Sequence, residues 1–166
     1  MRDGSDDEYV GYVSARVPAL RRLAYVLTGD GHRADDLVQQ TITTLYVKWQ
    51  RARGADNLDG YVRTMLIRTF LDEKRLAWAR VRLFREAPEP APVTDGGTED
   101  REVIRAALRR LPRRQRAVLV LRFFYDLPVD EVARMLDCSP GTVKSHTSRG
   151  LTALRGQLGV RALATP

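Results

Sequence analysis

The sequence predicts an all-α protein of two small helical domains joined by a flexible acidic linker. Apolar residues recur at spacings of three and four along most of the 166 residues, which is the period of a helix buried on one side. No segment alternates apolar and polar residues convincingly, so no strand is expected. Residues 86–100 contain three prolines and two adjacent glycines without any apolar period. We therefore expect domains at residues 1–85 and 101–166, with the linker at 86–100.

Charge is distributed unevenly along the chain. Residues 1–85 carry 15 basic and 11 acidic side chains, the linker carries five acidic and no basic ones, and residues 101–166 carry 13 basic and five acidic ones. The net charges of the three parts are +4, −5 and +8, within a total of +7. Two basic blocks suggest a polyanionic partner such as nucleic acid, or a membrane surface. Composition alone slightly favours the alternative, a soluble protein with scattered arginines.

The composition excludes several classes of protein. With 43% apolar residues the chain is too hydrophobic for wholesale disorder. Its single cysteine rules out an intramolecular disulfide framework and indicates a reducing compartment. No run of 18 apolar residues occurs, so no membrane span is expected. The polar, acidic start of the chain is unlike a signal peptide.

Three main helices are expected before the linker. The first ends at the turn of residues 28–31, and its apolar stripe is formed by Val13, Val17, Leu20, Ala24 and Leu27. The second runs from about Ala34 to Trp49, and its inward residues are Val38, Ile42, Leu45, Tyr46 and Trp49. After a loop at residues 51–59, Asp59 is expected to cap the third helix, which reaches the low eighties. The inward residues of this helix are Val62, Leu66 and Phe70.

Four helices are expected after the linker. The first stops before Pro112, and its apolar stripe is formed by Val103, Ile104, Ala107, Leu108 and Leu111. The second spans about Arg114–Tyr125. The inward residues of the third helix are Val129, Val132, Ala133 and Leu136. The fourth helix starts near Gly141.

The last two helices match the pattern of a helix-turn-helix. Ser139 is a suitable N-cap, and Pro140 suits the first helical position. At ~100° per residue, the apolar side of the last helix is formed by Val143, Thr147, Leu151 and Leu154. The opposite side is short, polar and basic, and it is formed by Lys144, Ser145, Ser148 and Arg149.

This outward side predicts contact with DNA. It lies in the first two turns of the helix, where a recognition helix meets base edges and phosphates in a major groove. A simple solvated face is the alternative, but such a face usually mixes Glu with Lys, and residues 141–155 contain no acid. The candidate DNA contacts of this domain are Arg122, Ser139, Thr142, Lys144, Ser145, Ser148 and Arg149.

No residue pattern indicates catalysis or a bound cofactor. His32 and His146 lie in different domains, and the chain has neither a carboxylate cluster at metal spacing nor a Gly-rich phosphate loop. Cys138 has no partner cysteines with which to form a zinc site. We therefore expect no catalytic residue, no metal site and no cofactor.

Two runs in the second domain resemble region four of bacterial sigma factors: LPRRQRAVLVLRFFY at residues 111–125 and VDEVARMLDCSPGTVKSH at residues 129–146. The resemblance is closest to the extracytoplasmic-function group of the sigma-70 family, and within it to the actinobacterial SigE-like subfamily. It implies that this domain reads the −35 element of a promoter and sits on the β flap of RNA polymerase. Output domains of response regulators share a similar GTVKSH run. A standalone helix-turn-helix regulator with an N-terminal helical partner domain is therefore the alternative.

The first domain is similar to region two of the same family, through ADDLVQQT at residues 34–41 and LYVKW at residues 45–49. The resemblance implies that this helix binds the clamp helices of the polymerase β′ subunit, with contacts from Asp36, Gln39 and Gln40. The helical wheel independently favours a protein partner, because the outward side has little charge and includes an apolar residue. That side is formed by Asp36, Gln40, Thr43 and Val47. Gln40 stands where the family usually has Glu.

The run LDGYVRTMLIRTFLDEKR at residues 58–75 resembles the family's −10-reading segment. The resemblance implies that a melted promoter strand is contacted by Arg53, Asn57, Tyr61, Arg68 and Arg75. On one continuous helix Arg68, Arg75 and Arg82 share a face, and such a basic stripe suits a single-stranded backbone. An arginine-rich solvated face explains the helical wheel almost as well, and the resemblance favours the DNA contact. The loop at residues 53–61 corresponds to the family's pocket for an extruded base. Arg68 stands where many relatives have Asn.

The resemblance covers residues 9–160, with the two regions and the linker in the family's order. It implies a promoter-specificity subunit of the bacterial cytoplasm that binds core RNA polymerase and promoter DNA and catalyses no reaction. Many relatives are held by an anti-sigma factor, which is a further expected partner. The standalone regulator explains the second domain equally well, but it explains neither the polar face at Asp36 and Gln39 nor the stripe at Arg68.

Overall fold

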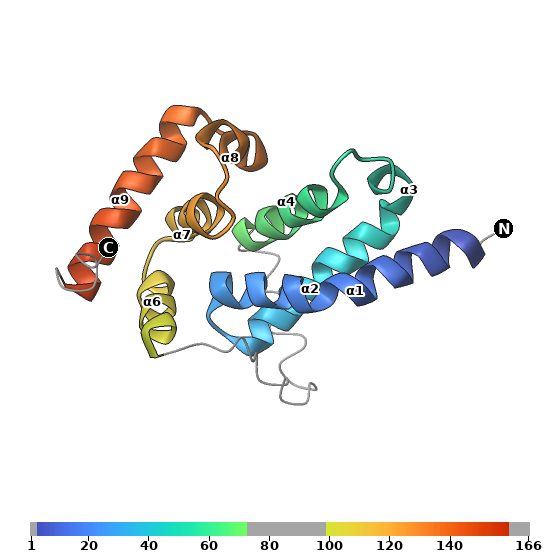
Figure 1. Cartoon of the computed structure of the whole chain (residues 1–166), viewed down its shortest axis with the longest axis horizontal. Coiled ribbons are helices and arrows are strands. Elements are labelled where there is room, and N and C mark those ends of the chain that lie inside the picture. Colours follow the sequence, from blue (N-terminus) through green and yellow to red (C-terminus); the bar gives the residue numbers. More distant parts are fainter. Residues whose placement is uncertain (1–2, 73–98, 160–166) are drawn as a thin grey trace. The chain divides into compact units, whose positions relative to one another are not determined.

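The computed structural model describes residues 3–72 and 99–159, and every regular element within these two ranges is a helix (Figure 1). The predicted all-α fold class is therefore confirmed. The chain divides into two compact units, unit 1 (Met1–Val93) and unit 2 (Thr94–Pro166). None of the helices in the described ranges is long and apolar enough to cross a membrane.

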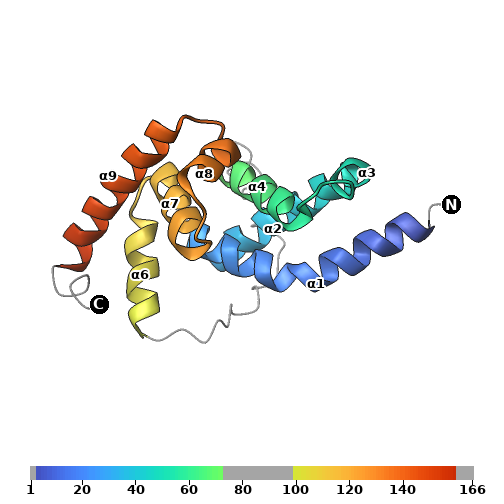
Figure 2. The same ribbon diagram turned by 45° about the horizontal axis from the view of Figure 1, so that its top comes forward.

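The described part of unit 1, residues 3–72, contains three long helices. α1 (Asp3–Thr28) and α2 (Gly31–Val47) pack against each other, and α4 (Leu58–Leu71) packs on both (Figures 1 and 2). The one-turn helix α3 (Trp49–Ala52) follows α2 and precedes the loop to α4. All three long helices contribute to the core, whose large, fully buried side chains are Leu27, Leu37, Leu45, Val62, Leu66, Ile67 and Phe70.

α2 begins three residues earlier than the sequence pattern suggests. Asp30 is its N-cap, and the Asp30 carboxylate accepts hydrogen bonds from the backbone N–H groups of His32 (2.8 Å) and Arg33 (3.2 Å). These bonds satisfy donors that the first turn of a helix leaves without a partner. The helix therefore starts at Gly31 rather than near Ala34, because the cap at Asp30 outweighs the helix-breaking tendency of glycine.

The cap of α4 also differs from the prediction. The Asn57 side chain accepts a hydrogen bond from the backbone N–H of Gly60 at 2.9 Å, so Asn57 is the N-cap and the predicted capping role of Asp59 is wrong. Asp59 lies in the first helical turn, where its charge favours the positive end of the helix dipole. Its carboxylate instead binds side chains of α1.

α4 is shorter than predicted. Asp72 follows its last residue with backbone angles of φ −85° and ψ 81°, which are outside the helical range. One continuous helix into the low eighties is therefore wrong, and the seven-residue register from Arg68 to Arg75 and Arg82 does not hold through Asp72. Arg75, Arg82 and residues 86–98 of the predicted linker lie outside the described residues.

Tyr46 is exposed, although the helical pattern places it inward. Its side chain is 53% exposed, and its ring lies edge-on to Tyr9 with the centroids 5.1 Å apart. Tyr9 lies edge-on in turn to the buried ring of Trp49, at 5.5 Å. The length of α1 brings Tyr9 to the C-terminal end of α2, so Tyr46 borders the core there and is not enclosed by it.

Unit 2 contains α6 (Glu99–Arg109), α7 (Arg113–Leu119), α8 (Val129–Leu136) and α9 (Pro140–Leu158). α7 continues directly into η1 (Val120–Phe124), a short segment of π-helix. α9 packs against α6, α7 and α8. The large, fully buried side chains of this core are Val118, Val120, Leu121, Val132 and Val143.

α9 approaches α7 closely at one glycine. A Cβ atom added to Gly150 would lie 2.9 Å from Leu119 Cδ1 and 3.1 Å from its Cγ, which is closer than side chains ordinarily come. Only a residue without a side chain fits this crossing unless Leu119 moves. Gly150 therefore sets the distance between α9 and the rest of unit 2.

The apolar stripe predicted from the sequence is only partly buried in α6. Val103 and Ile104, predicted to face inward, are 53% and 40% exposed. The buried apolar residues of α6, Ala107 and Leu108, lie in its second half. Buried among them is Arg105, whose guanidinium pairs with Glu102 at 2.7 Å. The first turn of α6 therefore extends beyond the packed core.

A second buried arginine stabilises the end of α6. The Arg116 guanidinium donates hydrogen bonds to the backbone carbonyls of Arg109 (2.8 Å) and Leu111 (2.9 Å). Carbonyls at a helix C-terminus have no partner within the helix, so these bonds fix the turn between α6 and α7.

Candidate nucleic-acid and polymerase interfaces

A tight turn joins α8 to α9 and orients α9. Asp137 ends α8 in the left-handed conformation, at φ 53° and ψ 52°, which aspartate tolerates better than most residues. The Cys138 N–H then donates to the carbonyl of Ala133 at 3.0 Å. The Ser139 hydroxyl caps α9 by accepting from the N–H of Thr142 at 3.1 Å, and Pro140 occupies the first turn. The helix-turn-helix expected from the sequence is therefore present.

The outward side of α9 is free for a ligand. Val143, Gly150 and Leu154 are buried, whereas the side chains on the opposite side are exposed: Lys144, Ser145, Ser148 and Arg149. Within the described residues neither Lys144 nor Arg149 forms an ion pair or a side-chain hydrogen bond. We call these four residues the α9 face. Their contact with DNA stays a prediction.

Other candidate residues of unit 2 already have local partners. The Arg122 guanidinium donates from Nη1 to the Leu127 carbonyl at 2.7 Å and lies over the ring of Phe123, 5.9 Å from its centroid. Arg122 thereby holds the turn before α8. The Ser139 and Thr142 hydroxyls are 2.9 Å apart, within hydrogen-bonding distance of each other. Arg122, Ser139 and Thr142 therefore help to shape the two turns that flank α8, and their contact with DNA stays a prediction.

His146 lies beside the α9 face and is half-buried. Burial lowers the pKa of its imidazole below the ordinary value, and the positive charges of Arg114 and Arg149 lower that pKa further. A lower pKa favours the neutral form of the ring. The positive charge of this region comes from arginine and lysine.

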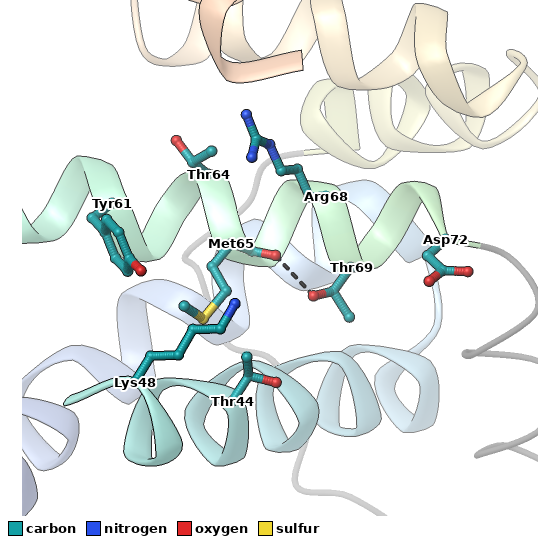
Figure 3. A pocket seen from close by; sticks show the side chains of 8 residues that line it. All are labelled: Thr44, Lys48, Tyr61, Thr64, Met65, Arg68, Thr69 and Asp72. Carbon is teal, nitrogen blue, oxygen red and sulfur yellow. Dashed lines mark hydrogen bonds between the residues drawn. The ribbon is translucent and has the colours of Figure 1, made fainter. Parts of the chain in front are cut away.

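In unit 1 a pocket of about 470 Å³ lies between α2 and α4 (Figure 3). Its lining residues are Thr44, Lys48, Tyr61, Thr64, Met65, Arg68, Thr69 and Asp72. Tyr61, Met65 and Thr69 project from α4 toward α2, and Lys48 extends from the end of α2 toward Met65 (Figure 3). Thr64 and Arg68 project from the other edge of α4.

The pocket is lined by both hydrogen-bond donors and acceptors. The Thr64 and Thr69 hydroxyls donate to the carbonyls of Gly60 (2.9 Å) and Met65 (2.8 Å), so their oxygens are left to accept. The Asp72 carboxylate is also an acceptor. Lys48 and Arg68 supply positive charge and donors. A ligand that fits this lining has an anionic group and N–H donors.

The structure splits the predicted −10 residues into two groups. Tyr61 and Arg68 line the pocket, but Arg53 and Asn57 do not. Arg53 pairs through Nη2 with the Glu8 carboxylate at 2.6 Å, and Asn57 caps α4. Arg75 lies outside the described residues.

The predicted polymerase-binding residues lie on α2 with different exposure. Gln39 is exposed, whereas Asp36 and Gln40 are half-buried. The Gln40 Oε1 atom is buried and has no hydrogen-bond partner among residues 3–72 and 99–159. Gln39, Thr43 and Val47 form an exposed row at spacings of four residues, and Val47 is 80% exposed. We call this row the α2 stripe.

Several residues with potential function were missed by the sequence reasoning. Thr44, Lys48 and Asp72 line the pocket, and the four-residue spacing of Thr44 and Lys48 puts both on one side of α2. The sequence does not reveal that this side faces α4. Phe123 and Phe124 are 56% and 61% exposed, although they continue an apolar run that predicts burial.

Comparisons with known proteins give a family match for each of the two units. The family model described as sigma-70 region 2 matches residues 12–80, and that described as sigma-70, region 4 matches residues 101–154. The RNA polymerase sigma-E factor of Streptomyces coelicolor is 35% identical over 94% of this chain and 89% of that protein. The ECF RNA polymerase sigma factor EcfG of Rhodopseudomonas palustris is 30% identical over 89% of this chain and 83% of that protein.

A solved structure has the same fold. The sigma factor RpoE of Bartonella quintana, crystallised with the anti-sigma factor NepR, superimposes with a TM-score of 0.68 at 26% identity, over 93% of this chain and 96% of that one. The match of unit 1 to region 2 is the finding that a standalone helix-turn-helix regulator does not explain. The chain belongs to the sigma-70 family of RNA polymerase sigma factors, in its extracytoplasmic-function group.

Proposed function

We propose that this sigma factor binds core RNA polymerase in the bacterial cytoplasm and directs it to promoters with two elements. Unit 2 reads the −35 element as a duplex, and unit 1 holds the −10 element as a melted strand. The single observation that carries the assignment is that a region 2 unit and a region 4 unit occur in one chain, which a standalone regulator does not explain. The −35 role of unit 2 rests on the α9 face: four exposed polar or basic side chains, free of acid, on a well-packed helix.

The α9 face suits a major groove. Lys144 and Arg149 can contact phosphates or guanine edges, and the serines Ser145 and Ser148 are short enough to allow close approach. Because a single recognition helix buries little surface, duplex binding by unit 2 alone is modest. Holding both promoter elements in one chain raises the effective concentration of each contact for the other.

The pocket of unit 1 suits one unpaired nucleotide of the −10 strand. Tyr61 offers an aromatic ring for stacking, and Lys48 and Arg68 offer charge for the backbone. Asp72 and Thr69 present acceptors, which favour a base edge with amino groups. A base can occupy the pocket only after it leaves the duplex, so binding here favours the melted promoter.

The α2 stripe and the exposed aromatic pair are the proposed polymerase contacts. Gln39, Thr43 and Val47 suit the β′ clamp helices, because their side is exposed, barely charged and partly apolar. Phe123 and Phe124 suit an apolar element such as the β flap. For regulation we propose an anti-sigma factor as a partner, a class represented by the NepR bound to RpoE of Bartonella quintana.

Reconstitution tests the proposal. The chain is mixed with core RNA polymerase and a promoter library, and start sites are mapped by run-off transcription. We expect new start sites that share two upstream elements. Lys144→Ala with Arg149→Ala should reduce transcription from −35-dependent promoters and leave core binding unchanged. Absence of core association, or an equal loss of core binding in the double variant, would contradict the proposed division of labour.

A further inference from the structure

The N-terminal part of α1 contacts the loop that precedes α4 and the helix that follows it. At the start of that loop the Glu8 carboxylate pairs with the Arg53 guanidinium at 2.6 Å. Just after the loop, in the first turn of α4, Asp59 Oδ1 accepts from the Tyr12 hydroxyl at 2.7 Å and from Arg16 Nε at 2.9 Å. One face of α1 therefore spans the loop at residues 53–57.

Further contacts hold this part of α1 in place. The Tyr9 hydroxyl donates to the Ile42 carbonyl at 2.6 Å, and Gln50 Nε2 donates to the Ser5 hydroxyl at 2.8 Å. Because several contacts in addition to the ion pair place Glu8, loss of the Glu8 charge should leave α1 where it is.

The pair of Glu8 and Arg53 has the chemistry of a phosphate contact. Carboxylate and phosphate oxygens bind the guanidinium group in the same planar geometry. The two side chains are 47% and 39% exposed, so water and an incoming anion can reach both. Exposed pairs of this kind are weak enough to exchange partners.

We propose that the Glu8 carboxylate competes with the promoter backbone for Arg53. In the free protein Glu8 occupies the guanidinium, and a phosphate of the −10 strand must displace it. The acidic start of α1 thereby weakens binding of single strands that do not supply enough other contacts. This inference rests on the proposed function, together with the −10 role that the family resemblance implies for Arg53.

The two ends of the loop have different tasks in this arrangement. Asp59 has two partners on α1, Tyr12 and Arg16, and it anchors the end of the loop next to α4. Arg53 has Glu8 as its ion-pair partner and exchanges it for the phosphate. The loop therefore stays in position while its basic end changes from an internal to an external anion.

Asp7 provides a matched control for Glu8. Both residues are acidic and exposed, and they are adjacent on α1. Within the described residues, however, the Asp7 side chain forms no hydrogen bond or ion pair. Glu8→Gln and Asp7→Asn each remove one negative charge near the loop. Only Glu8→Gln also releases Arg53, so the difference between the two variants measures the competition.

The test uses the full chain and short fluorescent single-stranded DNA of mixed sequence, with anisotropy measured over a range of salt concentrations. We expect Glu8→Gln to tighten binding by about twofold to fivefold and Asp7→Asn to tighten it clearly less. The salt dependence should be steeper for Glu8→Gln, because the wild type breaks an internal ion pair when it binds DNA. Contributions from unit 2 are common to all variants and cancel.

The outcomes separate this inference from the proposed function. If Glu8→Gln binds no tighter than Asp7→Asn, or binds more weakly than wild type, the competition is refuted. Arg53→Gln should weaken binding, and adding Glu8→Gln to it should then have no more effect than adding Asp7→Asn. If Arg53→Gln leaves binding unchanged, the proposed −10 role of Arg53 fails, whatever Glu8 does.

Discussion

The two candidate DNA surfaces of this chain differ in how their polar side chains are partnered. On the α9 face Lys144 and Arg149 have no ion pair within the described residues, and they project from a helix whose other side is buried. In unit 1 Arg53 is paired with Glu8, and Asn57 caps a helix. The α9 face can thus bind DNA without rearrangement, whereas unit 1 must exchange internal partners for external ones.

The difference suits the two forms of DNA. A duplex has a regular groove, and a rigid, preorganised helix binds it with little loss of conformational freedom. A melted strand is irregular and must first leave its own duplex. Internal partners in unit 1 keep its polar groups hydrogen-bonded or ion-paired in the absence of DNA. Because these contacts must be broken on binding, they lower the affinity of unit 1 for single-stranded DNA.

The largest expected effect follows from removal of the two basic side chains of the α9 face. Lys144→Ala with Arg149→Ala should weaken promoter binding by the holoenzyme about tenfold to a hundredfold, with a salt slope smaller by about 1 for each lost phosphate contact. Filter binding at several salt concentrations measures both quantities. Arg155→Ala is the control, because Arg155 is exposed near the end of α9, on the same side of the helix but C-terminal to the four residues of this face. An equal loss in that variant would mean that only net charge matters.

The next largest effect tests the packing behind the α9 face. Gly150→Val should destabilise the chain by about 1–3 kcal/mol, because its side chain overlaps Leu119. Gly156→Val is a matched control on the same helix, since no atom lies within 4 Å of a Cβ added there. Thermal unfolding of both variants gives the comparison. Equal stability would show that α7 and α9 separate easily and that the α9 face is less rigid than we infer.

A smaller effect compares the N-caps of the two surfaces. Ser139→Ala and Asn57→Ala should each lower the free energy of unfolding by about 1 kcal/mol, whereas replacement by glycine should lower it by only a few tenths. Denaturant unfolding of the full chain measures these changes. If Asn57→Ala is neutral, the contacts of α1 with Asp59 already hold the start of α4, and unit 1 is anchored differently from unit 2.

The smallest effect is a pH dependence in unit 1. The hydrogen bond from Tyr12 lowers the pKa of the Asp59 carboxyl most, and Arg16 lowers it further, although partial burial raises it. A carboxyl whose pKa is lower in the folded state contributes stability above its unfolded pKa of about 3.9, and this stability is lost as the pH falls through the folded value. The unfolding temperature should therefore fall on acidification below about pH 5, by a few degrees at most because Asp59 is half exposed.

Two variants check the origin of that pH dependence. Asp59→Asn should reduce the fall of the unfolding temperature at acidic pH. Asp56→Asn, which makes the same substitution at an exposed position of the preceding loop, should leave this fall as in the wild type. Scanning calorimetry from neutral to acidic pH distinguishes the two. Identical profiles for both variants would mean that other carboxylates set the acid response.

The predictions that held concern single helices. The outward side of α9 follows from the spacing of Val143 and Leu154, and the cap at Ser139 follows from its position before Pro140. The predictions that failed concern the ends of helices and the contacts between them. Asn57 replaced Asp59 as a cap, α4 stopped before Asp72, and Tyr46 proved exposed.

The sequence by itself determined the all-α class, the helix-turn-helix and the family, because helical periodicity, capping and short motifs are local properties of the chain. Only the tertiary structure decided that Lys48 and Asp72 line a pocket with Tyr61, and that Glu8 pairs with Arg53 across 45 positions. Such contacts depend on how helices cross, and that is set by the packing of whole faces rather than by any one residue. For the same reason the sequence does not reveal that Arg53 has an ion-pair partner, whereas in the fold it pairs with Glu8.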